Sequence, residues 1–282
     1  MEMIELHHED VLKILPDRDP ESHKGTYGKI LLLCGSRGYT GAAALAAMGA
    51  LRSGAGLVFL GVPECIYAIE AGKLLEPVVF PLPDKQGKLS EKAIPRILDR
   101  VKQMDAVLMG PGMGQSEDVF QVVKAVLEQA ECPVILDADG INVISGHKDL
   151  LRGRTKPTIL TPHDGEFARI HPGTGRNRIT ESINFAAKTG TILLRKGHRT
   201  LITDGTTVYR NTTGNAGMAV GGSGDVLSGI IVSLLGQGIS PIEAAACGAW
   251  LHGGAGDLAA RELGQYGMLP SDMLRLLPRL MK

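Results

Sequence analysis

The sequence predicts a single three-layer α/β domain in which helices cover both faces of a mostly parallel sheet. Short apolar runs alternate with longer segments of helical periodicity along most of the 282 residues. The one strong hairpin signal comes late, which adds an antiparallel piece near the end of the sheet. No linker, fixed-period repeat or low-complexity tract interrupts the chain, so we expect one domain over residues 1–282.

Strands are expected where short apolar runs are bounded by turn residues. They are residues 29–34, 57–62, 77–82, 105–109, 133–137, 157–160 and 191–194. The dipeptide Asp204-Gly205 separates two further runs, 200–203 and 207–210. Because Asp-Gly favours the backbone of a tight turn, these two runs are expected to form the antiparallel hairpin.

Helices are expected where apolar residues recur three and four positions apart. They are residues 40–52, 91–103, 119–129, 179–188, 226–235, 241–263 and 273–280. Thr40 is a candidate N-cap for the first of these, because a threonine hydroxyl can accept a hydrogen bond from a free N–H group of the first turn.

The composition excludes several classes of protein. Thirty acidic and 30 basic residues cancel, and aromatic residues make up only 4%, so neither a field nor a stacking surface for nucleic acid is expected. No apolar segment approaches the ~18 residues of a membrane span, and the charged stretch Met1–Pro20 does not resemble a signal peptide. Cys34 and Cys132 lie in or beside apolar runs, which indicates buried free thiols and a cytoplasmic protein.

Five loops are expected to converge on one site. Loops 35–41, 110–114, 161–166 and 196–200 each follow a predicted strand, and the glycine-rich loop 214–225 precedes a helix. Parallel strands end at one edge of a sheet, where ligands bind in open α/β proteins. This convergence is the main argument from the residues for a functional site.

The glycine-rich loop gives the strongest signal. Its glycines leave backbone N–H groups uncovered just before an apolar helix, so we expect an anion site at the positive end of that helix. Asp225 closes the loop, and an ionised carboxylate beside a bound phosphate can orient or deprotonate a substrate hydroxyl. The alternative is a glycine turn with Asp225 as a structural cap, but the length and glycine density favour the anion site.

Two other loops carry acidic residues. His163, Asp164 and Glu166 offer an imidazole and two carboxylates that could orient a ligand or a metal–phosphate group. The two acids could equally complement the dipole of a helix start, whereas His163 is expected to contact ligand. Asp137 and Asp139 at a strand end suit either a magnesium shell or a polar anchor, and Asp139 could also cap a helix.

The remaining loops are less specific. Loop 110–114 lacks the GxGxxG spacing of a dinucleotide fingerprint, so it and loop 35–41 are better explained as places where a ligand approaches the backbone closely. Lys196 or Arg199 could meet a phosphate, although a solvated basic turn explains them as well. The sequence has no P-loop, no HExxH and no GxSxG motif.

Six motifs in order resemble the ATP- or ADP-dependent NAD(P)H-hydrate dehydratase family, the carboxy-terminal module of the bifunctional NAD(P)HX repair proteins. They are HKGTYG, GAAALAAMGALRSGAGLV, GPGMGQ, PVILDADGIN, ILTPHDGEFARI and GNAGMAVGGSGDVLSGII, and they extend from about Ser22 to the C-terminus. The resemblance implies a ribokinase-like fold. It also implies phosphorylation of the C6 hydroxyl of (6S)-NADHX or NADPHX, followed by loss of phosphate to restore NADH or NADPH.

The resemblance also assigns roles to residues. It makes Asp225 the base at the hydroxyl. The residues expected to line the hydrate pocket are Ala42, Gly112, Gly114, His163 and Asp225. Those expected to bind ADP or ATP are Lys196, Gly197, His198, Arg199, Thr200, Asn215, Gly217, Met218, Gly221, Gly222, Ser223 and Gly224. Mg²⁺ is the expected cofactor, with Asp139 and Glu166 as candidate ligands.

A homotetramer and a separate NAD(P)H-hydrate epimerase as pathway partner are likewise implied. Asp164 and Ala216 stand where the family commonly has proline, and Asp164 adds a negative charge near an anionic ligand. The competing interpretations are a kinase of a vitamin precursor, of the hydroxymethylpyrimidine or hydroxyethylthiazole type, and a nucleotide sensor without activity. Asp225 argues against the sensor, and the TPHDGE and GPGMGQ loops argue against the vitamin kinases.

Overall fold

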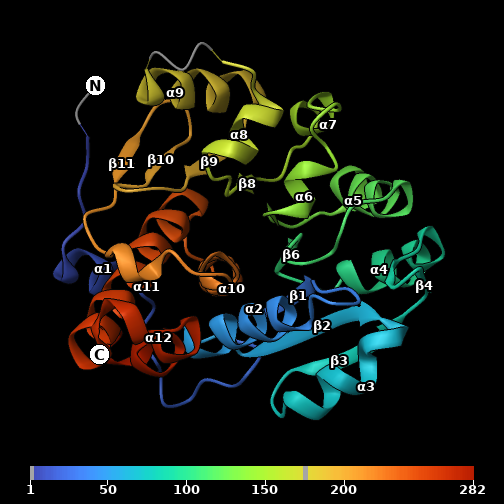
Figure 1. Cartoon of the computed structure of the whole chain (residues 1–282), viewed down its shortest axis with the longest axis horizontal. Coiled ribbons are helices and arrows are strands. Elements are labelled where there is room, and N and C mark those ends of the chain that lie inside the picture. The colour runs from blue at the N-terminus through green and yellow to red at the C-terminus, as the bar shows by residue number, and fades with distance from the viewer. Residues whose placement is uncertain (1–2, 174–176) are drawn as a thin grey trace.

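A single nine-stranded sheet forms the centre of the computed structural model, in the order β11-β10-β9-β8-β7-β6-β1-β2-β3 (Figure 1). The structure describes residues 3–173 and 177–282 of the predicted domain. The strands are β1 Lys29–Leu33, β2 Leu57–Pro63, β3 Val78–Leu82, β6 Ala106–Met109, β7 Val134–Leu136, β8 Thr158–Leu160, β9 Ile192–Arg195, β10 Leu201–Thr203 and β11 Val208–Arg210.

Neighbouring strands from β3 through to β9 pair in parallel, which confirms the predicted sheet. Strand β10 is antiparallel to both β9 and β11, as the late hairpin signal predicts. The hairpin turn is closed by Asp204, whose carboxylate accepts from the N–H groups of Thr206 and Thr207 at 2.8 and 2.7 Å. A second, two-stranded sheet of β4 Asp84–Lys85 and β5 Lys88–Leu89 was not predicted.

The helices follow the apolar periodicity in most places. They are α1 His8–Ile14, α2 Thr40–Arg52, α3 Glu64–Lys73, α4 Ile94–Val101, α5 Glu117–Gln129, α6 Asp139–Asn142, α7 Asp149–Arg152, α8 Asp164–Ile170, α9 Arg178–Thr189, α10 Ser223–Gly236, α11 Pro241–Gly267 and α12 Pro270–Leu276. Figure 1 shows α10 beside α2, with α11 and α12 next to them.

The sheet has a hydrophobic core on each face, because successive side chains of a strand point to opposite faces. Ile30 and Leu32 of β1 belong to the core that includes apolar residues of α2, α10, α11 and α12. Leu31 and Leu33 belong to the core that includes residues of α4, α5, α8 and α9. Helices therefore cover both faces of the sheet, which confirms the three-layer prediction.

Two glycines bring α2 and α10 into backbone contact. A Cβ atom at Gly229 of α10 would lie 2.2 Å from the carbonyl oxygen of Ala46, and one at Gly49 of α2 would lie 2.7 Å from that of Val226. No larger residue fits at either position without moving the helices apart. The start of α10 is thus fixed relative to α2.

Two predictions at helix starts are wrong. Helix α10 begins at Ser223 rather than at residue 226, so Asp225 lies in its first turn. The sequence gives no signal for this start because Gly222, at φ 95°, precedes the helix and has no side chain to cap it. Thr40 is the first residue of α2 and not its N-cap, and its hydroxyl accepts from Lys73 Nζ at 2.7 Å.

Helices α1, α3 and α7 were not predicted, and the helix expected at 91–103 is shorter. It consists of a 3-10 turn, Glu91–Ala93, followed by α4. The helix expected at 273–280 is α12, which starts at Pro270, followed by a 3-10 turn. These short or weakly amphipathic segments depend on their neighbours for stability more than on their own periodicity.

Cys34, Cys132 and Cys247 are buried free thiols and Cys65 is an exposed one, which confirms the expectation for Cys34 and Cys132. Burial raises the pKa of Cys132 to about 11 and that of Cys247 to about 12. Within residues 3–173 and 177–282, the helices are all too short or too polar to cross a bilayer.

Candidate active site

The loops at the carboxyl edge of the sheet contact one another, as predicted. The Gly35 N–H group after β1 donates to the Pro111 carbonyl after β6 at 2.8 Å. The Lys196 N–H group after β9 donates to the Pro162 carbonyl after β8, also at 2.8 Å. The candidate site residues are assembled around these contacts and the first turn of α10.

The first turn of α10 presents unpaired backbone donors. In this described part of the chain, the N–H groups of Gly222, Gly224 and Asp225 have no protein acceptor, and that of Ser223 makes only a 3.3 Å bond to Val220. Free N–H groups and the positive end of the helix dipole both attract anions. The geometry therefore suits a phosphate group at this turn.

The glycine-rich loop before α10 is held by Asp257 of α11. Its carboxylate accepts from the Gly214 N–H group and from Asn215 Nδ2, both at 2.9 Å. Asn215 Oδ1 in turn accepts from the Gly217 N–H group at 3.0 Å, which closes a 3-10 turn. The loop thus has a defined conformation although little of it is helical.

Asp225 is a carboxylate with an unusual proton affinity. Burial, and then the nearby charge of Asp137, raise its pKa to about 6, while Lys196 acts in the opposite direction. A base is most effective when its pKa is close to the working pH. Asp225 at the phosphate-binding turn is therefore suited to accept a proton near neutral pH.

Beneath this turn, Asp137 connects three elements of the fold. This residue is 1% exposed, and its carboxylate accepts from Lys196 Nζ at 2.7 Å and from Ser228 Oγ of α10 at 2.5 Å. A Cβ atom on Gly224 would lie 3.4 Å from Lys196 Nζ, so the ammonium group lies directly under the turn. Burial disfavours its charge, but Asp137 and Glu166 outweigh burial and raise the pKa of Lys196.

His163 and Glu166 start α8 with reciprocal hydrogen bonds. His163 Nδ1 accepts from the N–H groups of Gly165 and Glu166, and the Glu166 carboxylate accepts from the His163 N–H group at 2.9 Å. The proton of a neutral His163 is therefore on Nε2. The His163 side chain is 55% exposed, but its Nε2 lies 3.4 Å from Glu166 Oε1, so this nitrogen already faces a carboxylate. Buried Glu166 also lies 3.8 Å from Lys196 Nζ.

The residues expected to line the hydrate pocket are partly brought together. A Cβ atom on Gly112, where φ is 62°, would lie 2.9 Å from the Cβ atom of Ala42, so the loop after β6 packs against the start of α2. The Gly114 N–H group and Gln115 Nε2 donate to Asp139 at 2.8 and 3.1 Å. Asp139 therefore holds this loop in position. Among the described residues, no hydrogen bond or ion pair joins His163 to this group.

The loop after β9 is open to solvent except at Lys196. Gly197, His198 and Arg199 are exposed, while the Thr200 hydroxyl donates to the Gly197 carbonyl at 3.0 Å. An exposed turn of this kind can receive a ligand without breaking a core contact.

The charge that Asp164 adds is compensated. Its carboxylate accepts from Arg195 Nε at 2.6 Å and from Arg178 Nε at 3.3 Å. Partial burial acts in the other direction, but the two guanidinium groups outweigh it and lower the pKa of Asp164. The repulsion expected between Asp164 and an anionic ligand is therefore largely cancelled by the two arginines.

Sequence reasoning missed three residues that support the site: Ser228, His252 and Asp257. Ser228 and Asp257 lie within predicted helices, where nothing distinguishes a structural polar residue from one that supports a loop. His252 could have been recognised as a candidate, since it is a lone imidazole inside an alanine- and glycine-rich helix.

The described residues suit a magnesium ion carried by a nucleotide better than a resident metal. No group of three His, Cys, Asp or Glu side chains among them is arranged to hold a metal ion. Mg²⁺ bound with a nucleotide needs only one or two carboxylates besides phosphate oxygens and water. Both Asp139 oxygens accept hydrogen bonds from the loop after β6. The buried Glu166 carboxylate also accepts a hydrogen bond, from the His163 N–H group, but it lies 3.8 Å from Lys196 Nζ under the phosphate-binding turn.

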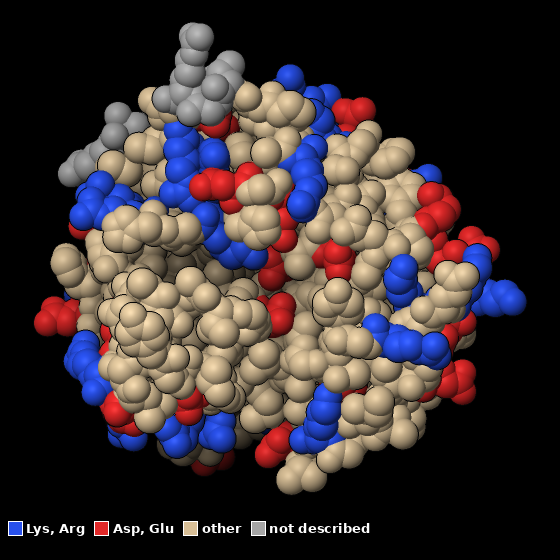
Figure 2. Space-filling view, viewed as in Figure 1, with Lys and Arg blue, Asp and Glu red and all other residues tan. Residues whose placement is uncertain are grey.

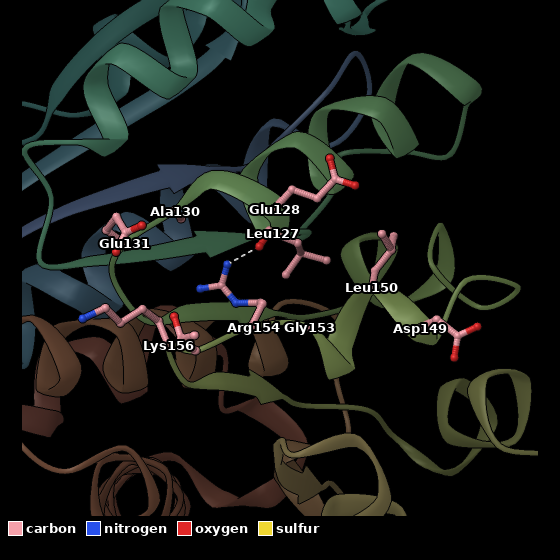
Figure 3. Close-up of a pocket in the computed structure, with 10 residues that line it drawn as sticks. Leu127, Glu128, Ala130, Glu131, Asp149, Leu150, Gly153, Arg154 and Lys156 are labelled. Atoms are coloured by element: carbon pink, nitrogen blue, oxygen red, sulfur yellow. Dashed lines mark hydrogen bonds between the residues drawn. The ribbon is translucent and has the colours of Figure 1, made fainter.

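A hollow lies elsewhere, at the opposite edge of the sheet. It is lined by residues that precede β7 and β8, among them Glu131 and Lys156 (Figure 3). Figure 3 shows Arg154 donating to the Leu127 carbonyl, which closes the end of α5. This hollow is therefore separate from the candidate active site.

Charge is mixed over the face of the molecule that Figure 2 shows. Figure 2 shows acidic and basic side chains side by side on this face, and a broad area with neither at the lower left, where Figure 1 places α11 and α12. A surface without one dominant sign agrees with the absence of net charge. An anionic ligand must therefore be held by local groups.

The sheet order, with an acidic residue at a glycine-lined helix start, defines a ribokinase-like α/β protein. A ribokinase-like protein from Enterococcus faecalis superposes with a TM-score of 0.88 at 29% identity, covering 99% of this chain and 95% of that one. Residues 30–279 match the NAD(P)H-hydrate dehydratase family model, and the chain belongs to that family.

Relatives of two lengths support this membership. The ADP-dependent (S)-NAD(P)H-hydrate dehydratase of Bacillus subtilis is 38% identical, over 97% of this chain and 96% of its own. A Bacillus subtilis ADP/ATP-dependent NAD(P)H-hydrate dehydratase crystallised with ATP and Mg²⁺ superposes with a TM-score of 0.81 at 34% identity, covering 97% of this chain and 96% of that one. The bifunctional NAD(P)H-hydrate repair enzyme of Moorella thermoacetica is 43% identical over 95% of this chain, which spans 52% of it.

The chain thus spans about half the length of the bifunctional relatives. A hydroxyethylthiazole kinase from Pyrococcus horikoshii superposes with a TM-score of 0.60 at 14% identity, covering 90% of this chain and 87% of that one. At this identity the likeness concerns the fold alone, so it does not favour the vitamin-kinase alternative.

Proposed function

We propose that this protein is an ADP- or ATP-dependent dehydratase that restores NADH and NADPH from their (6S)-hydrates. The observation that carries the proposal is Asp225, a half-buried carboxylate with a pKa of about 6 beside free N–H groups of the α10 first turn. A base and a phosphate-binding turn in contact are what phosphoryl transfer to a hydroxyl requires.

In this proposal Asp225 removes the proton from the C6 hydroxyl of the hydrate. The hydroxyl oxygen then attacks the terminal phosphorus of the nucleotide, and AMP or ADP leaves. Phosphate is a far better leaving group than hydroxide, so the ring nitrogen can expel it from C6. Loss of a proton from the neighbouring ring carbon completes the dihydronicotinamide.

The nucleotide is proposed to bind along the loop 214–224 and at the exposed turn 197–200. The N–H groups of Gly222 and Gly224 would hold its phosphates, because they have no protein acceptor. The half-buried Lys196 is paired with Asp137 beneath the turn, so we propose that it acts on the phosphate site from there.

The hydrate is proposed to lie between the loop 110–114, the start of α2 and His163. The close approach of Gly112 to Ala42 leaves backbone rather than bulky side chains at this side. The His163 side chain is 55% exposed, so its ring can contact the substrate. Mg²⁺ would neutralise phosphate charge, and Glu166, whose carboxylate lies 3.8 Å from Lys196 Nζ under the turn, would be the acid that faces it.

The decisive experiment incubates the protein with NADPH hydrate, ADP or ATP, and Mg²⁺, and follows the absorbance of the reduced ring. Recovery of absorbance together with release of inorganic phosphate is expected. A stable phosphorylated product without recovery would instead support a small-molecule kinase. Comparing the two nucleotides and the two hydrates in the same assay gives their order of preference.

We further propose a homotetramer in the cytoplasm, supplied with the (S)-hydrate by an NAD(P)H-hydrate epimerase. The free cysteines fit a reducing compartment, and the longer relatives are called bifunctional. Light scattering coupled to size-exclusion chromatography tests the oligomer. Adding an epimerase to a mixture of the R and S epimers of the hydrate tests the partner, because recovery should rise from about half of the hydrate to nearly all of it.

A further inference from the structure

One face of α11 supports the phosphate-binding loop along its whole length. Asp257 binds Asn215, and two glycines of α11 leave room for other side chains of the loop. A Cβ atom at Gly253 would lie 2.2 Å from the Thr213 hydroxyl oxygen, and one at Gly256 would lie 2.3 Å from the Met218 sulfur. The last contact in this series reaches the first residue of α10. There, Nε2 of His252 lies 3.2 Å from the hydroxyl oxygen of Ser223.

The pair His252–Ser223 is buried, since each residue is only 8% exposed. Burial lowers the pKa of His252 to about 4, so the imidazole is neutral and carries one N–H proton. A buried polar pair contributes little more to folding than two apolar side chains of the same shape. Its place directly beside the free N–H groups of Gly224 and Asp225 therefore points to a role in the site.

We propose that His252 is a positioning residue for the nucleotide: its Nε2–H donates to Ser223 Oγ and thereby turns the hydroxyl proton of Ser223 toward the bound phosphate. The opposite tautomer would take up that proton and leave only lone pairs facing an anion, which repels phosphate. The inference rests on the proposed nucleotide site at the start of α10 and extends it to α11.

The test measures binding of ADP with Mg²⁺ by titration calorimetry to the wild-type chain, His252→Leu, Ser223→Ala and the double variant. Loss of one neutral hydrogen bond should weaken binding about five- to tenfold in each single variant. Because both changes remove the same interaction, the double variant should bind no more weakly than either single one.

Ser233→Ala is the matched control, since Ser233 is a buried serine of α10 that bonds Gln237, away from the site. It should bind ADP like the wild type. His252→Gln, which can place an amide N–H near Ser223, should recover most of the affinity. Thermal unfolding separates binding from stability: the double variant should regain stability lost by His252→Leu but not the affinity.

Wild-type affinity in Ser223→Ala or in His252→Leu would overturn the inference, as would losses that multiply in the double variant. The outcome for the dehydratase proposal is read independently, from recovery of the reduced-ring absorbance by the wild type. Weakened ADP binding in the variants without that recovery would support the role of His252 and refute the dehydratase.

Discussion

Replacing the proposed base should make the protein more stable. Asp225→Asn keeps the size and shape of the side chain but removes a charge that is partly withdrawn from water. The raised pKa of Asp225 means that the ionised carboxylate is less stable in the native state than in the unfolded chain. Activity and stability should therefore change in opposite directions in one variant.

The magnitude follows from the shift of the Asp225 pKa, from 3.8 to about 6. Between these two values the native state binds a proton that the unfolded state has lost, so stability falls as the pH rises through this window. Above about pH 6 Asp225 is ionised in both states, so the stability of the native state falls no further with pH. Two pKa units correspond to about 3 kcal/mol, which is the upper limit of the stability that Asp225→Asn should gain near pH 8.

Denaturant unfolding of both proteins at pH 4 and pH 8 tests this reasoning. Their free energies of unfolding should be similar at pH 4 and differ by about 2–3 kcal/mol at pH 8, with Asn more stable. Turnover by the variant should be abolished while ADP still binds, because the N–H groups of the turn remain.

Asp204→Asn is the control of opposite sign. Hydrogen bonds from Thr206 and Thr207 outweigh the effect of partial burial and lower the pKa of Asp204, so its ionised form stabilises the hairpin above that pKa. This control should be less stable than the wild type at pH 8. Two results would show that the pKa of Asp225 is not raised in the native state and that our account of the base is wrong. Asp225→Asn could be less stable than the wild type at pH 8, or the two proteins could differ in stability as much at pH 4 as at pH 8.

Three further predictions concern the substrate site, the pH profile and the thiols. First, kcat/KM for the hydrate should fall about tenfold per pH unit below about pH 6, where Asp225 becomes protonated; a flat profile from pH 8 to pH 5 would exclude this base. Second, Gly112→Ala should raise KM for the hydrate about tenfold but leave ADP affinity unchanged, since its φ is 62° and its new Cβ would press on Ala42. Gly153→Ala, with open space around it, is the control and should change neither. Third, a thiol reagent should modify Cys65 in the native protein, and the other three cysteines only after unfolding; early modification of more than one would contradict their burial.

The fold could be predicted from the sequence because its strands are short apolar runs that alternate with amphipathic helices. Burial on both faces makes residues such as Ile30 and Leu31 equally apolar, which is typical of the strands of a parallel sheet. Helix α3 could not be predicted because it buries only two of its ten residues, Ile66 and Glu70. Its periodicity was too weak to indicate a helix.

The site could be predicted only as a set of loops. Glycine density identified the turn before α10, and the position of Asp225 at its end indicated a base. Nothing in the sequence indicates that Asp137 and Lys196, 59 residues apart, form a buried ion pair under that turn. Such contacts depend on the order of strands in the sheet, which local patterns do not encode.

The contact between α2 and α10 has a consequence for how two ligands are held. The hydrate is proposed to meet the first turn of α2 and the nucleotide that of α10, and Gly49 and Gly229 allow the backbones of these helices to touch. Two rigid rods joined in this way cannot slide independently, so the reacting oxygen and the phosphorus keep their separation from one turnover to the next. A methyl group at residue 229 would spread the two helices and lengthen that separation, while every side chain that touches either ligand stayed the same.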